Sequence, residues 1–277
     1  MPTLHAIILG IVQGLSEFLP ISSSGHLILV PELFHWNELT HHESLNKTFD
    51  VALHIGTLIA AFWYFRRDIA TYLLAAWHSA RARAITTTNQ RMAWLLLLSA
   101  VPGVIFGAAL ESTIEDSLGD PVLIGANLVV FGLVLAWADR AVGKRAVDGF
   151  RFRDAVLMGL AQAVALAPGV SRSGVTISAG RGLQFDRESA TRLSFLMSLP
   201  IIVGAALYKG FKLFRDGGIP HGYGSAFAWG IVASTISGFI AIAVLLRFVR
   251  SHSFRSFVVY RLIAGVAVII IFATGVR

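Results

Sequence analysis

Apolar runs with little charge divide the sequence into long segments and polar connections. A helix needs about 20 apolar residues to cross a bilayer, and runs of about 10–14 more often form re-entrant segments. Six runs are long enough for a full span: residues 49–65, 92–110, 121–138, 193–208, 226–246 and 257–273. Asp50 and Arg261 lie near the ends of two of these runs. We therefore predict six transmembrane helices.

Two further apolar stretches are interrupted by polar and helix-breaking residues. Residues 6–28 contain Glu17 and Pro20, and residues 155–180 contain Arg172. A proline inside a helix removes a backbone hydrogen bond and kinks or breaks the helix. We predict that each stretch forms a re-entrant helical hairpin, which enters the membrane and returns to the same side.

The two interrupted stretches resemble each other. The first has Gly10-Ile-Val-Gln13 and then Pro20-Ile-Ser-Ser-Ser-Gly25, and the second has Gly159-Leu-Ala-Gln162 and then Pro168-Gly-Val-Ser-Arg-Ser-Gly174. The interval from Gln to Gly is 12 residues in both copies, and the copies lie 149 residues apart. A chance match of short Gly, Ser and Pro motifs is the alternative to a true repeat.

Three predicted spans follow each hairpin, so the second copy is expected to be inverted in the membrane. Residues 1–140 then form the first repeat and residues 150–277 the second, within one membrane domain of residues 1–277. Inverted repeats with broken helices are common in transporters, and the substrate site lies where the repeats meet. The predicted fold is an all-α integral membrane protein with six full transmembrane helices and two re-entrant hairpins that meet at the active site.

Composition supports a membrane protein. Hydrophobic residues make up 55% of the sequence and charged residues only 14%, against about 25% charged in an ordinary soluble domain. This excludes a water-soluble enzyme and a disordered chain. The net charge of +7 is scattered over short loops, which argues against a nucleic-acid-binding protein. There is no cysteine, so thiolate metal sites are excluded.

Loop charges predict the orientation in the membrane. Basic residues exceed acidic ones in residues 66–91, 139–154, 181–192 and 247–261, whereas acidic residues prevail in residues 30–48 and 111–120. By the positive-inside rule the first group is cytoplasmic and the second external. The basic excess in residues 209–216 disagrees with this topology. The first apolar stretch lacks a basic residue at its start, and we expect it to be retained.

Polar side chains at membrane depth are costly and mark functional candidates. Glu17 is the only acidic residue in residues 1–31, and Gln13 lies four residues earlier, on the same helix face. Oxygen ligands at this spacing suit Mg²⁺ or Ca²⁺, completed by water and phosphate oxygens. The alternatives are a neutral Glu17 carboxyl satisfied by a neighbour and a simple Gln–Glu packing pair.

The serine-rich turn offers both an anion site and a reactive group. Ser22, Ser23 and Ser24 precede the predicted second half-helix, where hydroxyls and free N–H groups bind anions; simple N-capping is the alternative. His26 follows directly. A neutral imidazole can attack phosphorus or act as a general acid or base, and the alternative is a structural, hydrogen-bonded histidine.

Arg172 is the only charged residue in residues 155–180. A buried guanidinium needs an anion, and phosphate matches its fork geometry. Ser171, Ser173 and Thr176 are expected to add hydroxyl donors to the same phosphate site. A structural salt bridge between Arg172 and Glu17 is the alternative, and both interpretations hold together if Glu17 pairs with Arg172 until the substrate arrives.

Asp50 and His54 are four residues apart at the start of a predicted span. We interpret them as a hydrogen-bonded pair at the membrane interface rather than as a support for the site. Altogether, the residues favour cleavage or transport of an anionic, phosphorylated membrane substrate.

The motifs resemble those of the bacterial undecaprenyl-diphosphate phosphatases, also called bacitracin-resistance proteins. Residues 13–26 are similar to the family's E/Q-x-x-x-E motif followed by Ser-Ser-x-Gly-His. Residues 168–176 are similar to its P-G-x-S-R-S-x-x-T motif. The resemblance extends over the whole chain. It implies hydrolysis of undecaprenyl diphosphate to the monophosphate carrier lipid in the bacterial inner membrane, with a divalent cation and an active site open to the periplasm.

The resemblance also implies roles for single residues. Glu17 would be the essential carboxylate, as metal ligand or base, and Ser23 and His26 are competing candidates for nucleophile or acid–base. Arg172 would clamp the diphosphate. The supporting phosphate-binding residues would be Ser22, Ser171, Ser173 and Thr176. Many members have a second Glu at position 13, so the neutral Gln13 is expected to bind Mg²⁺ or Ca²⁺ more weakly.

A lipid-phosphate flippase that leaves the diphosphate intact is the rival hypothesis, since it needs the same arginine and serines but no nucleophile. A membrane scaffold is a weaker one, because it gives no reason to bury Glu17 and Arg172. The expected partners are a polyprenyl diphosphate and membrane lipids, without nucleic acid. The oligomeric state stays open, with a homo-oligomer among the alternatives.

Overall fold

The computed structural model describes residues 1–277 except 37–42, 110–118, 216–221 and 275–277. Within the described residues the protein is helical, with a short 3₁₀ turn at Val147–Gly149 and one isolated bridge between Arg145 and Phe185 but no β-strand. Much of the acidic charge assigned to residues 30–48 and 111–120, and residue 216, lies outside the described residues.

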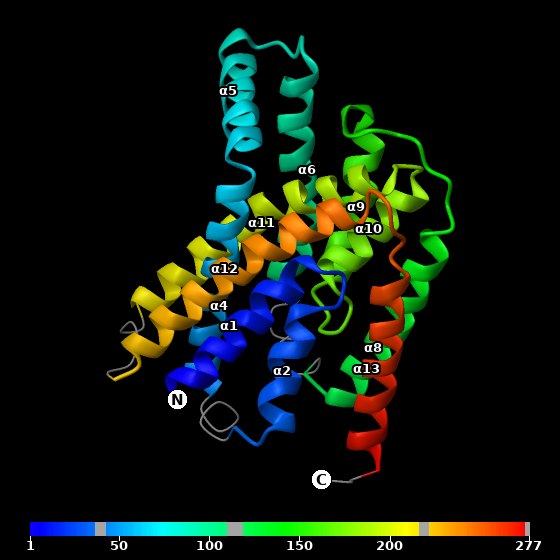
Figure 1. The fold of residues 1–277 in the computed structure, drawn as a ribbon. Coiled ribbons are helices and arrows are strands. Elements are labelled where there is room, and N and C mark those ends of the chain that lie inside the picture. The colour runs from blue at the N-terminus through cyan, green and yellow to red at the C-terminus, as the bar shows by residue number, and fades with distance from the viewer. Residues whose placement is uncertain (37–42, 110–118, 216–221, 275–277) are drawn as a thin grey trace.

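Each predicted span lies in a helix. These helices are α4 (Glu43–Tyr64), α6 (Thr88–Ala109), α8 (Pro121–Ala138), α11 (Arg187–Arg215), α12 (Gly224–Phe248) and α13 (Arg255–Ala273) (Figure 1). Five of them are long and apolar enough to cross a membrane alone, and α4 meets the same criterion only together with the helix that follows it. The all-helical membrane protein is therefore confirmed, with five or six candidate spans among the described residues.

Both interrupted stretches form two helices with a break between them. The first comprises α1 (Thr3–Phe18) and α2 (Ser23–Leu33), and the second comprises α9 (Phe152–Val164) and α10 (Arg172–Gly182). The helices end and restart where the sequence has Pro20 and Pro168.

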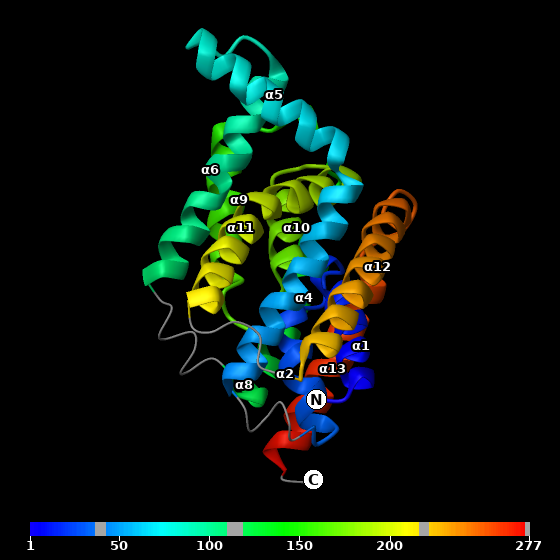
Figure 2. The ribbon, with the colours of Figure 1, turned by 90° about the vertical axis from the view of Figure 1, so that its left-hand side faces the viewer.

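Helix α5 (Arg66–Ala82) corrects the interpretation of residues 66–91 as a connecting loop. It is bent by 80° from α4 and projects from the helix bundle at the top of both ribbon views (Figures 1 and 2). The indole of Trp94 on α6 donates to Ser79 Oγ on α5 at 2.7 Å. The charged residues in residues 66–83 conceal this helix from a search for long uncharged apolar runs.

Each half of the chain packs a broken helix against the other half. Helix α1 packs along α12, and α9 packs along α6. Glycines allow both contacts: a Cβ on Gly14 would lie 2.0 Å from Ser237 Oγ, and one on Gly159 would lie 2.6 Å from the Ser99 backbone oxygen. Close backbone approach at small residues is typical of membrane helix packing.

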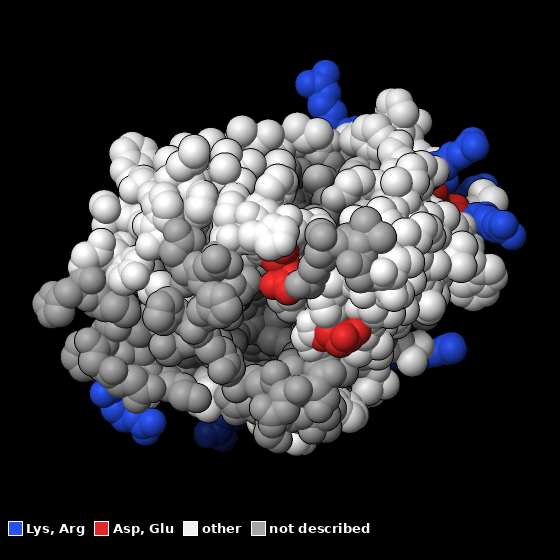
Figure 3. All heavy atoms as spheres, turned by 90° about the horizontal axis from the view of Figure 1, so that it is seen from below, with Lys and Arg blue, Asp and Glu red and all other residues white. Residues whose placement is uncertain are grey.

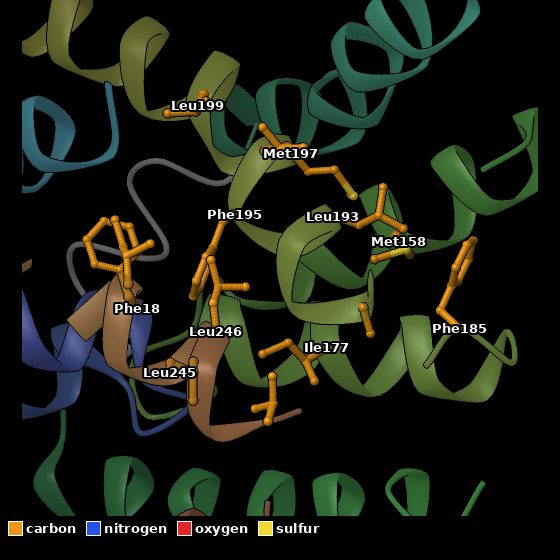
Figure 4. Close-up of a cluster of buried hydrophobic side chains, with 14 of the residues drawn as sticks. Phe18, Met158, Ile177, Phe185, Leu193, Phe195, Met197, Leu199, Leu245 and Leu246 are labelled. Carbon is orange, nitrogen blue, oxygen red and sulfur yellow. The ribbon is translucent and has the colours of Figure 1, made fainter. Parts of the chain in front are cut away.

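The largest buried apolar cluster supports the inner ends of α1 and α10 (Figure 4). Phe18 on α1 meets Phe195 on α11 edge-to-face, with ring centroids 5.4 Å apart. Ile177 on α10 and Leu245 on α12 are buried in the same cluster. These contacts fix the two broken helices behind the residues that line the site.

We expect Gly14→Ala to destabilise the folded protein, because the added methyl would meet Ser237 Oγ and the backbone of Ser234 and Gly238. Overpacking of this kind costs about 1–3 kcal/mol. Thermal unfolding of the purified protein in detergent measures the effect. Gly204→Ala on α11 is the matched control, because its methyl would meet open space. Equal melting temperatures for the two variants would contradict the prediction.

Candidate active site

A cavity of about 370 Å³ lies where the two broken helices meet. Its polar wall comes from the breaks and from α4, and an apolar wall comes from α2 and α11. The lining residues are Glu17, Ser22, Ser23, Ser24, Leu27, Ile28, Asp50, Val51, His54, Gln162, Ala165, Leu166, Ser171, Arg172, Ile201, Ile202, Ala205 and Ala206. Seen from below, the protein is hollowed beside acidic atoms, and basic atoms lie at the margin (Figure 3).

Glu17 is the centre of the polar contacts. Its side chain is only 6% exposed. Oε2 accepts the Ser23 hydroxyl at 2.6 Å and the Gln13 amide nitrogen at 3.2 Å. Oε1 accepts Arg172 Nη2 at 3.1 Å. A serine hydroxyl directed at a carboxylate is the geometry of a nucleophile beside its base.

Arg172 begins α10 and crosses the junction to reach Glu17. The resulting ion pair joins the two broken helices. The other terminal nitrogen, Nη1, is buried and has no acceptor among the described residues. A buried guanidinium donor without a partner is costly, so an incoming anion would satisfy it. The ion pair between Arg172 and Glu17, which the sequence left open as the alternative to phosphate binding, is thus present in the structure.

Ser22 and Ser171 have equivalent roles at the two breaks. Each accepts a hydrogen bond from a backbone N–H three residues later and caps the next helix. Their φ angles are +80° and +72°, an uncommon conformation for a residue with a side chain. Ser22 Oγ also accepts the Gly169 N–H of the other break at 3.1 Å. The N-termini of α2 and α10 thus both lie beside the cavity, where their dipoles favour an anion.

His26 lies outside the residues that line this cavity. Its Nδ1 donates to the Ser22 backbone oxygen at 2.6 Å, and Tyr260 Oη lies 2.5 Å from Nε2. The two rings are stacked, with centroids 5.7 Å apart. Both ring nitrogens are therefore engaged, and in this arrangement Ser23 is the better placed of the two candidate nucleophiles.

Three other predicted site residues are buried beside the cavity without lining it. The Ser173 hydroxyl donates to the Leu19 backbone oxygen at 3.0 Å, which ties α10 to the first break. Thr176 Oγ1 lies 2.6 Å from Ser194 Oγ on α11. Gln13 directs its amide nitrogen at Glu17, and its buried Oε1 has no hydrogen-bond partner among the described residues. Of the predicted phosphate-binding residues, Ser22, Ser171 and Arg172 line the cavity.

The sequence interpretation missed the place of His54. His54 Nδ1 hydrogen-bonds to the Asp50 backbone oxygen at 2.7 Å, and Nε2 lies 3.8 Å from Glu17 Oε2. Asp50 and His54 both line the cavity, which corrects their interpretation as an interfacial pair without a part in the site. The spacing of four residues between Asp50 and His54 was the only signal in the sequence that they act together. Packing of α4 against α1 brings this pair to Glu17.

The donor set fits a divalent cation that is shared with the substrate. Glu17 and Asp50, two residues with carboxylate side chains, both line this cavity. Among the described residues, no cluster of three or more His, Cys, Asp or Glu side chains could hold a metal ion. Mg²⁺ is usually bound by one or two carboxylates together with substrate phosphates and water. The cavity therefore fits this mode better than an all-protein cage.

Comparison of the sequence with models of known protein families identifies the family of this chain. A sequence model described as bacitracin resistance protein BacA matches residues 6–267. The chain belongs to this family. The matched range includes every residue that lines the cavity.

Similar relatives carry the name undecaprenyl-diphosphatase. The protein from Pelobacter propionicus is 48% identical, with 100% of this chain and 99% of the relative covered. Those from Pelotomaculum thermopropionicum and Geobacter metallireducens are each 46% identical, with 98% or more of either chain covered. The family is thus shown over the full length of the chain.

We expect Ser22→Ala to destabilise the protein more than Ser22→Gly. Both variants remove the acceptor of the Gly25 and Gly169 N–H groups, but only glycine adopts a positive φ without strain. Loss of an N-cap to alanine costs about 1 kcal/mol and to glycine a few tenths. Thermal unfolding in detergent gives the order, and a less stable glycine variant would contradict it.

Proposed function

We propose that this protein hydrolyses undecaprenyl diphosphate to undecaprenyl phosphate and inorganic phosphate. The observation that carries the proposal is the contact of Ser23, Glu17 and Arg172 at one cavity between the broken helices. The names of the relatives support the same substrate and reaction. In the cell this reaction recycles the carrier lipid for cell-wall synthesis and underlies bacitracin resistance.

The proposed mechanism begins with Ser23. Its Oγ attacks the terminal phosphorus while its proton passes to Glu17 Oε2, 2.6 Å away. The bond between this phosphorus and the bridging oxygen breaks, and undecaprenyl phosphate leaves. Water then cleaves the phosphoserine and releases inorganic phosphate. Phosphoryl transfer depends mainly on positioning and charge neutralisation, which Arg172 and the N-termini of α2 and α10 supply.

The proposed cofactor is a divalent cation, Mg²⁺ or Ca²⁺. Glu17 and Asp50 would hold it from the cavity wall, and the substrate phosphates would complete its coordination. When bound, it neutralises negative charge on the diphosphate. Gln13 was predicted as a second ligand, and its unpartnered Oε1 is the group that would have to turn toward the cation.

The proposed membrane arrangement has six crossings and two re-entrant hairpins in inverted repeats, with the cavity open to the periplasm. The packing supports this symmetry, because α1 of the first half packs on α12 of the second, and α9 of the second half packs on α6 of the first. Basic loops stay in the cytoplasm, and the basic atoms visible in Figure 3 lie at the margin rather than beside the hollow, which supports an external opening. The apolar wall formed by α2 and α11 would take the first isoprene units of the lipid.

A lipid flippase without hydrolysis is not favoured. Transport would need the arginine and the helix N-termini, but it gives no role to a serine hydroxyl 2.6 Å from a buried carboxylate. Turnover separates the two functions, because a flippase leaves the diphosphate intact.

The proposal predicts release of inorganic phosphate from a long-chain polyprenyl diphosphate by the purified protein in detergent. We expect release with Mg²⁺ or Ca²⁺, none with chelator, and none from Arg172→Ala, which lacks the phosphate clamp. Arg172→Lys keeps the charge without the fork and is expected to retain partial activity. Substrate binding without phosphate release by the folded wild-type protein would favour the carrier function. Near-normal turnover by Arg172→Ala would show that Arg172 is not needed to bind the diphosphate.

The site geometry also predicts different effects for the two candidate nucleophiles. We expect Ser23→Ala to lower kcat by at least about 1,000-fold, since the covalent step is lost. We expect His26→Gln to lower kcat about 10-fold or less, because its ring bonds to Ser22 and Tyr260 are positional, and misplacement costs less than loss of a reacting group. Phosphate release measures both. The reverse order would assign the attack to His26.

A further inference from the structure

Arg261 on α13 is a fully buried arginine without a role in the mechanism above. Its side chain is 0% exposed. The sequence placed it near the end of a span, but its guanidinium lies between α8 and both helix breaks. No carboxylate lies within 4.0 Å of it in the described part of the chain. A buried charge is costly unless its hydrogen bonds are satisfied.

Five backbone carbonyls satisfy this guanidinium. Nε donates to Leu128 at 3.1 Å, and Nη2 donates to Asn127 at 3.2 Å, both on α8. The other three acceptors belong to the breaks: Pro20 at 3.2 Å, Gly169 at 2.9 Å and Val170 at 3.0 Å. Arg261 is thus bonded to the first break and to the second break at once.

These carbonyls lie within two residues of the residues that form the site. Pro20 is separated from Ser22 by Ile21 alone, and Val170 directly precedes Ser171 and Arg172. In a trans peptide the C=O and N–H groups point in opposite directions. By holding the Val170 carbonyl, Arg261 turns the Ser171 N–H away from itself. Ser171 lines the cavity.

The breaks need such support because their backbone is strained. Ser22, Ser171 and Gly169 all have positive φ angles. Non-glycine residues keep this conformation only where the surroundings over-determine it, frequently at functional sites. Arg261 on α13 donates hydrogen bonds to carbonyls of both breaks.

We propose that Arg261 is a positioning residue for phosphoryl transfer, which sets the two breaks so that Ser23 and Arg172 act on the same phosphorus. This rests on the proposed function. The guanidinium acts through the backbone and touches no reacting atom. A lysine has one donor centre in place of the rigid fork with five N–H donors, so it cannot hold both breaks and α8 together.

Arg181 offers a matched control within the same chain. It is also buried, with 3% exposure, and it donates to the Phe185 backbone oxygen at 2.6 Å and to that of Ala141. Unlike Arg261, it also has a carboxylate partner, because its Nε lies 3.5 Å from Asp139 Oδ1. It lies at the far end of α10 from Arg172. Substituting Arg181 removes a buried guanidinium from backbone carbonyls without touching the breaks.

The experiment compares Met and Lys variants of Arg261 and of Arg181 as purified, folded protein. It measures melting temperature, kcat, KM for a polyprenyl diphosphate, and inhibition by orthovanadate, a mimic of five-coordinate phosphorus. We expect Arg261→Met and Arg261→Lys to lower kcat about 100-fold, the effect of a 1 Å misplacement, and to change KM less than about 3-fold. The inhibition constant for vanadate should rise in parallel with the loss of kcat.

We expect the Arg181 variants to lose thermal stability while folded protein keeps its kcat and its vanadate affinity. The proposal fails if Arg261→Lys keeps wild-type kcat, or if Arg261→Met lowers only the melting temperature. It also fails if neither Arg261 variant folds while both Arg181 variants do, because Arg261 is then only a folding residue. A wild-type protein that releases no phosphate would instead contradict the proposed function.

Discussion

Two helices are broken inside an apolar protein, and each break exposes backbone groups that must find partners there. Lipid offers no hydrogen bonds, so irregular backbone at membrane depth is tolerated only where protein or a wet cavity satisfies it. Here the N–H groups are capped by Ser22 and Ser171, and carbonyls are bound by Arg261. Ser23, Ser24 and Arg172, which begin the helices after the breaks, line the cavity, so the site originates at the breaks.

The two breaks are connected to each other as well as to the rest of the protein. Ser22 accepts an N–H from the second break, and Ser173 donates to a carbonyl of the first. The Glu17–Arg172 ion pair adds a third connection. A buried ion pair contributes little net stability, because desolvation offsets the attraction. The pair lies at the cavity, and Arg172 Nη1 has no acceptor among the described residues. This arrangement suits exchange of the Glu17 carboxylate for a phosphate.

Helix α13 links the apolar frame to this polar junction. Its neighbouring residues Tyr260 and Arg261 point to different partners: the tyrosine holds His26 on α2, and the arginine holds the carbonyls of both breaks. Helices α13 and α8 pack closely where Gly125 and Gly265 meet. A displacement of α13 would therefore shift α2 and both breaks together.

The sequence by itself determined the helices and the residues with unusual polarity. Apolar length predicted the long helices, and proline, serine and charge predicted the two breaks, because bilayer thickness and backbone hydrogen bonding constrain each segment locally. The family motifs marked Glu17, Ser23 and Arg172. Helix α5 was missed, since a helix that contains several charged residues gives no long apolar run.

Only the tertiary structure decided which candidates share the cavity. It brought His54 to 3.8 Å from Glu17 and turned His26 toward Tyr260. It also put Arg261, 241 residues away along the chain, against Pro20. Such contacts depend on how α4, α8 and α13 pack against the breaks, and no local pattern of polarity carries that information.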